Sequence, residues 1–154
     1  MTDTVLEQAI NQVEAARSGN RPVVRTFFDE ATFTATHVVY DPASRRAAII
    51  DSVLDFEQAS GRTTTGSAEA VAEFVEAAQL GVDWILETHA HADHLSAAPF
   101  LKARLGGEVV IGAEITRVQQ TFAKVFNEPA GFAQDGSQFD RLMSDGDTFS
   151  LGTI

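Results

Sequence analysis

The segment Thr88–His94 constrains the fold of this chain more than any other stretch. It reads Thr-His-Ala-His-Ala-Asp-His, and it holds three of the chain's four histidines together with a carboxylate. Residues 82–87 before it have the apolar pattern of a buried strand, and residues 95–101 after it have the pattern of a helix start. Ligand-type side chains at a strand exit are typical of sites in α/β folds. The segment therefore predicts an α/β fold with a metal site at the end of a strand.

The rest of the chain alternates between strand and helix patterns. We expect a leading helix and linker in residues 1–21, followed by one domain in residues 22–154. Residues 52–66 are polar and are expected to form an irregular loop beside the site. The domain is expected to contain an antiparallel meander (23–28, 32–40, 46–51), helices (67–80, 97–105, 113–126), a strand (108–111) and a final turn and strand (143–152).

Composition excludes several classes of partner and ligand. The net charge of −11 disfavours nucleic acid and membrane surfaces, which are themselves negatively charged. No apolar run approaches the roughly 20 residues of a membrane span, and no secretory signal is recognised. The chain has no cysteine, so a metal would be held by histidine and carboxylate. These features favour a cytoplasmic protein.

The spacing of the four candidate ligands, His89, His91, Asp93 and His94, suits a metal ion. In extended chain, residues two apart point the same way, so His89 and His91 reach one ion. Asp93 and His94 follow where the chain turns and would face an adjacent position. Imidazole and carboxylate ligands suit zinc, iron or manganese. Asp93 has two further interpretations, as a base acting on metal-bound water or as a group that orients a ligand imidazole. His37, in the second predicted strand, is interpreted as a structural or surface residue.

The segment resembles the His-x-His-x-Asp-His signature of the metallo-β-lactamase superfamily. Similarity extends from about residue 22 to the C-terminus and includes residues 27–29, 48–51 and 145–147. The chain looks most like the persulfide dioxygenase (sulfur dioxygenase) branch and its β-lactamase-hydrolase-like relatives, with the glyoxalase II branch as the nearest alternative. The resemblance implies an αββα sandwich of two similar halves. Residues 22–154 would be mainly the N-terminal half, with the second half absent.

The resemblance also implies ligand sets. In hydrolytic members, the positions of His89 and His91 bind one metal, and those of Asp93 and His94 bind a second. In persulfide dioxygenases a single iron(II) uses the position of His89 together with a later His and a later Asp. Those later ligands are expected beyond Ile154, because no histidine follows His94 in this chain.

Three functions follow from these expectations. The leading one is an iron-dependent persulfide dioxygenase that oxidises a glutathione-type persulfide to sulfite with O2. The second is a zinc hydrolase of the glyoxalase II or lactonase type, acting on thioesters or esters. The third is a truncated half-domain that binds metal weakly and lacks catalysis. Loss of a second half would leave an apolar sheet face, which a second copy of the chain would cover.

Overall fold

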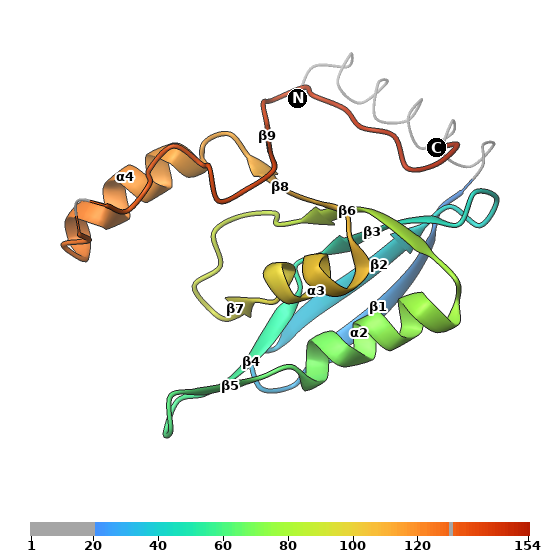
Figure 1. The fold of residues 1–154 in the computed structure, drawn as a ribbon, viewed down its shortest axis with the longest axis horizontal. Helices are drawn as coiled ribbons and strands as arrows, with labels where there is room; N and C mark the ends of the chain where they lie inside the picture. Colours follow the sequence, from blue (N-terminus) through green and yellow to red (C-terminus); the bar gives the residue numbers. More distant parts are fainter. Residues whose placement is uncertain (1–20, 130) are drawn as a thin grey trace, which may run out of the picture.

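The computed structural model describes residues 21–129 and 131–154 (Figure 1). The predicted leading helix therefore lies outside the described residues. The described elements are β1 (Val23–Asp29), β2 (Thr34–Tyr40), β3 (Arg46–Ile50), β4 (Val53–Glu57), β5 (Arg62–Thr64), α2 (Gly66–Ala77), β6 (Gly81–Leu86), β7 (Leu95–Ser96), α3 (Ala98–Leu105), β8 (Glu108–Gly112), α4 (Ile115–Val125) and β9 (Arg141–Met143). Among these described elements, no helix is long and apolar enough to cross a membrane.

The strands form two sheets. One has six strands in the order β1-β2-β3-β6-β8-β9, and the other has three in the order β5-β4-β7. The pairs β1–β2 and β2–β3 are antiparallel, which confirms the predicted meander. The pairs β3–β6, β6–β8 and β8–β9 are parallel. The carboxyl ends of β3, β6 and β8 therefore meet at one edge of the sheet, and the histidine segment begins where β6 ends.

Helices α2 and α3 cover one face of the larger sheet (Figure 1). Both helices place apolar side chains against the alternate residues of β3 and β6 that face them. Ile49, Val75, Ile85 and Leu101 are almost completely buried there. Burial of each such side chain contributes about 1.5–3 kcal/mol to folding. This packing fixes the strand ends from which the site is built.

Helix α4 is much less covered. It projects away from α2 and α3 (Figure 1), and Phe122, Val125 and Phe126 are each about half exposed or more. The rings of Phe122 and Phe126 stack on each other with centroids 5.6 Å apart.

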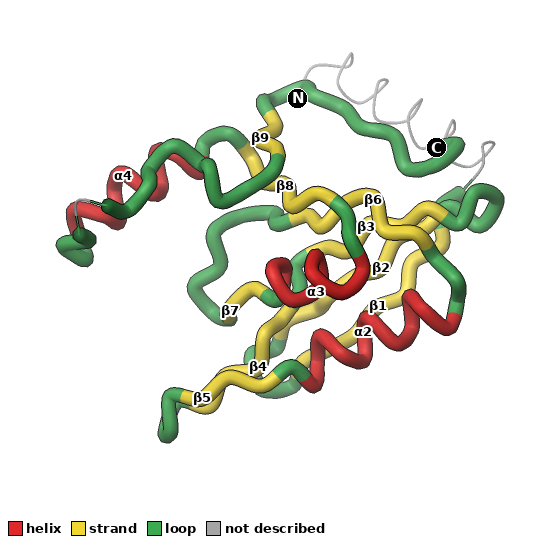
Figure 2. Tube along the Cα trace, viewed as in Figure 1, coloured by secondary structure: helices red, strands yellow, loops and turns green. Residues whose placement is uncertain are grey.

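Two sequence predictions of local structure were wrong. Residues 52–66 are not an irregular loop, because β4 and β5 form an antiparallel hairpin there (Figure 2). Of the turn and strand expected in residues 143–152, only Met143 lies in a strand of the described chain, because β9 pairs with β8 at residues 141–143. Leu151 is nevertheless buried, and the Ser150 carbonyl accepts a hydrogen bond from Trp84 Nε1 at 2.9 Å. This segment is anchored by side chains and not by a ladder of backbone bonds.

Candidate metal centre

The histidine segment lies in the loop that leaves β6 and returns through β7 to α3. Its base is fixed by backbone bonds to both neighbouring strand ends. The Glu87 amide donates to the Val110 carbonyl at 2.9 Å, and the Asp51 amide donates to the Leu86 carbonyl at 3.0 Å. Asp51 has φ of 51°, a left-handed conformation that aspartate tolerates better than most residues. This conformation turns the chain at the end of β3 and leaves the Asp51 carboxylate beside the loop.

His91, Asp93 and His94 form one group of potential ligands. Each offers one ligand atom, and these atoms lie within 4.8 Å of one another. Asp93 Oδ1 lies 3.4 Å from His94 Nδ1 and 3.9 Å from His91 Nδ1. The structure thus brings together three of the four residues predicted as ligands.

The surroundings of His94 favour metal binding by this group. Its side chain is completely buried, and its Nε2 atom has no hydrogen-bond partner among residues 21–129 and 131–154. A buried polar atom without a partner is costly and uncommon unless another group satisfies it. A mixed set of imidazole and carboxylate donors fits divalent zinc, iron or manganese.

His89 lies beside this group without being part of it. Its side chain is exposed, and its ring centroid is 4.3 Å from that of His91. Its Nδ1 atom is 2.8 Å from Thr88 Oγ1. The role of His89 as a ligand remains a proposal.

A second group of potential ligands lies on the other side of the His91 ring. Asp51, Glu87 and His91 also offer atoms within 4.8 Å of one another. His91 Nε2 lies 2.9 Å from Asp51 Oδ1 and 3.0 Å from Glu87 Oε2. Asp51 also accepts bonds from Thr88, from its amide at 2.8 Å and from its hydroxyl at 2.7 Å.

Sequence reasoning missed both of these carboxylates. Glu87 was assigned to the end of a buried strand, and Asp51 to the end of the meander. One available signal was that each carboxylate lies at the end of a predicted strand. Acidic residues at adjacent carboxyl ends of parallel strands are brought close together.

The carboxylates on the two sides of the His91 ring have pKa values shifted in opposite directions. Burial raises the pKa of the Glu87 carboxyl, opposed by the hydrogen bond from Ser96. The Asp93 carboxyl has its pKa lowered, first by its own backbone amide and further by the Thr34 hydroxyl. Thr34 Oγ1 donates to Asp93 Oδ2 at 3.1 Å and lies 3.5 Å from His94 Nδ1. The start of β2 therefore supports the open side of the site.

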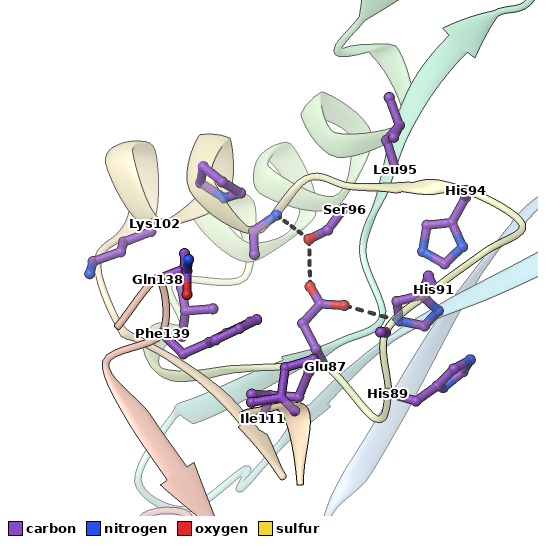
Figure 3. A pocket seen from close by; sticks show the side chains of 15 residues that line it. Glu87, His89, His91, His94, Leu95, Ser96, Lys102, Ile111, Gln138 and Phe139 are labelled. Carbon is purple, nitrogen blue, oxygen red and sulfur yellow. Dashed lines mark hydrogen bonds and ion pairs between the residues drawn. The ribbon is translucent and has the colours of Figure 1, made fainter. Parts of the chain in front are cut away.

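Two cavities adjoin the segment. One, of about 440 Å³, is bordered by Glu87, the three motif histidines and residues of α3 and β8 (Figure 3). The other, of about 490 Å³, lies between the segment and α4, and its lining includes Phe122, Phe126 and Phe132. The site therefore has room beside it for a small molecule.

Comparison with known proteins agrees with this geometry. The model of the family described as "Metallo-beta-lactamase superfamily" matches residues 32–153. The chain is 55% identical over 131 residues to a probable metallo-hydrolase of Burkholderia pseudomallei (strain 1710b), covering 85% of this chain and 45% of that protein. It is 25% identical over 153 residues to the mitochondrial persulfide dioxygenase ETHE1 of Homo sapiens, covering 99% of this chain and 48% of that one.

A solved structure shows the same likeness. The crystal structure of ETHE1 from Myxococcus xanthus superposes with a TM-score of 0.58 at 25% identity, covering 84% of this chain and 44% of that one. The chain spans about half the length of the curated relatives it matches. The sandwich fold expected from the resemblance is confirmed for the portion that this chain covers. The chain belongs to the metallo-β-lactamase superfamily.

Proposed function

We propose that this chain belongs to a metal-dependent persulfide dioxygenase. The observation that carries the proposal is the likeness in fold and sequence to the two ETHE1 proteins, which extends over most of the chain. In the proposed reaction, glutathione persulfide, O2 and water give glutathione and sulfite. The activity is proposed for the complete protein, since this chain spans about half of its relatives.

The chain's own residues would contribute a set of nitrogen and oxygen ligands. His89, His91, Asp93 and His94 are the proposed metal-binding residues. Bound iron(II) would supply the open coordination positions that O2 and a persulfide sulfur require. Buried His94 presents its Nε2 atom, which has no hydrogen-bond partner among the described residues, and Thr34 holds the Asp93 carboxylate in place. The cavity of about 440 Å³ beside Glu87 is the space proposed for a thiol-derived substrate.

The second candidate is a zinc-dependent hydrolase of thioesters or esters. It is favoured by the name of the relative at 55% identity, a probable metallo-hydrolase, and by the close grouping of His91, Asp93 and His94. Bound zinc would supply a polarised water for attack on a carbonyl. Asp93 would then act as a base toward that water or orient it.

Metal analysis and two assays, on this chain and on the complete protein, separate these candidates. For the complete protein, the expected result is bound iron, with O2 uptake that depends on glutathione persulfide and is abolished by a chelator. Bound zinc with thioester hydrolysis and no O2 uptake would establish the second candidate instead. Weak metal binding with neither activity would support the catalytically incompetent half-domain. The variant His37→Ala is the matched control, because His37 lies outside the segment and hydrogen-bonds Thr26.

A further inference from the structure

Glu87 is a buried carboxylate at the base of the histidine segment (Figure 3). Its side chain is only 4% exposed. One oxygen, Oε1, accepts a hydrogen bond from Ser96 Oγ at 2.6 Å. The other, Oε2, lies 3.0 Å from His91 Nε2 but has no partner with hydrogen-bond geometry among the described residues. Burial of such a group opposes folding, so its presence calls for a reason other than packing.

Ser96 connects Glu87 to the far end of the segment. Besides donating to Glu87, its hydroxyl oxygen accepts from the Ala98 amide at 3.0 Å, where α3 begins. Ser96 also pairs with Val53 across β7 and β4. Glu87 directly precedes Thr88, and Ser96 follows His94 by two positions. The Glu87–Ser96 contact therefore joins the two ends of the segment.

The carboxylates of Glu87 and Asp51 both lie beside the His91 ring, and Asp51 is hydrogen-bonded to its Nε2 atom. Two carboxylate oxygens, one from Asp51 and one from Glu87, lie within 3.0 Å of Nε2. A carboxylate only accepts, so Nε2 carries the proton of the neutral ring. The acceptor nitrogen is then Nδ1, which faces Asp93 at 3.9 Å. Carboxylate partners on the far nitrogen of a ligand imidazole orient such rings in metal sites.

We propose that Glu87, held by Ser96, is a positioning residue that fixes the His91 ring with Nδ1 presented to the metal. This inference rests on the proposed role of His91 as a metal ligand. Asp51 acts on the same nitrogen from the end of β3. Glu87 acts from the start of the loop, directly before the histidine segment. Glu87 thereby couples the orientation of His91 to the closure of the segment onto α3.

The first test needs no metal. Long-range proton–nitrogen NMR spectra of the metal-free chain are recorded at about pH 8, where an ordinary histidine is neutral. We expect the His91 ring to be in the Nε2–H form in the unmodified chain. We expect Glu87→Gln, which keeps the side-chain volume, to shift both ring nitrogen resonances of His91. Glu57→Gln is the matched control, because Glu57 also accepts from a serine, Ser60 Oγ at 2.5 Å, but in an exposed hairpin.

The second test measures zinc affinity by competition with a chromophoric chelator. We expect Glu87→Gln to weaken binding by about 10-fold or more, as is typical when a partner of a ligand imidazole is removed. Ser96→Ala should weaken zinc binding less, because the Glu87 carboxylate remains and loses only the hydrogen bond from Ser96. Glu57→Gln should leave affinity unchanged. We also expect the thermal midpoint of metal-free Glu87→Gln to equal or exceed that of the unmodified chain, since a buried charge is removed.

The outcomes separate this inference from the proposed function. His91 resonances that Glu87→Gln leaves unchanged would overturn the positioning role, whatever the metal results are. A lowered thermal midpoint in Glu87→Gln with unchanged zinc affinity would also overturn it, in favour of a purely structural role. An unmodified chain that binds no metal would contradict the proposed metal centre. In that event the His91 resonances of the metal-free chain still decide the orientation by Glu87.

Discussion

Two buried carboxylates, Asp41 and Glu87, have opposite surroundings in this protein. Asp41 lies in the turn between β2 and β3 and is completely buried. It accepts bonds from backbone and hydroxyl groups at 2.6–3.3 Å, contributed by Ala43, Ser44 and Thr153. Glu87 accepts from Ser96, and its second oxygen lies near the His91 nitrogen but has no hydrogen-bond partner within the described part of the chain.

The pKa of each group follows from its donors. The bond from the Ser44 hydroxyl, with those from Thr153, holds the pKa of Asp41 well below its usual range. Burial raises the pKa of Glu87 because its single donor does not offset desolvation. Similar burial thus accompanies two roles. A carboxylate saturated with donors stabilises the fold, whereas one left short of donors beside a proposed ligand histidine is a candidate for a functional role.

The largest effect on folding should come from Asp41→Asn. The NH2 group of asparagine would face hydrogen-bond donors from which the Asp41 carboxylate accepts. The hydrogen bonds between the β2–β3 turn and residues 151–154 would therefore be lost. We expect the urea midpoint to fall more than for any other single change discussed here. A lowered folded-state pKa gives stability that is present above the ordinary value of about 4 and is lost as pH falls below it.

The pH dependence gives this prediction its control. The urea midpoint of the unmodified chain should fall steeply as pH decreases below about 4. The midpoint of Asp41→Asn should be lower at neutral pH and should change less over the same acidic range. Equal acid sensitivity in both proteins would show that Asp41 does not provide this stability.

A smaller loss is expected from Asp51→Asn. Asn tolerates the left-handed backbone at this position, so the change tests the side chain alone. It disturbs three bonds, two from Thr88 and one from His91. We expect the free energy of unfolding of the metal-free chain to fall by about 1.5–3 kcal/mol.

The control for Asp51→Asn is Asp83→Asn, which breaks a partly exposed ion pair with Arg46 and should cost about 1 kcal/mol or less. Urea titration of both variants measures the difference. Equal losses in the free energy of unfolding would mean that the Asp51 carboxylate stabilises the fold no more than a partly exposed ion pair does.

The sequence was sufficient for local features and insufficient for the surroundings of the motif. Strands β1–β3 were predicted because their β-branched and aromatic residues form continuous runs. The β4–β5 hairpin was missed because its second strand, residues 62–64, is Arg-Thr-Thr and so carries no apolar residue. The motif predicted a metal site from four adjacent ligands.

The partners of that motif could not be read from local sequence. Asp51 bonds to Thr88 across 37 positions, and Thr34 bonds to Asp93 across 59. Only the order of strands in the sheet brings these residues together. Ser96 was interpreted as part of a helix start, and its bond to Glu87 depends on how tightly the segment closes. Such contacts are a product of tertiary structure and leave no periodic pattern.

The smallest effect should come from the open side of the His91 ring, at Thr34. Asp93 is more than half exposed there, so water can replace a lost hydroxyl donor. We expect Thr34→Val to weaken zinc binding by about fivefold, equivalent to a net hydrogen bond of about 1 kcal/mol. Thr26→Val is the matched control, because its hydroxyl bonds His37 on the same sheet, away from the segment. A loss from Thr34→Val as large as that from Glu87→Gln would show that the open side positions the ligands as strongly as the buried side does.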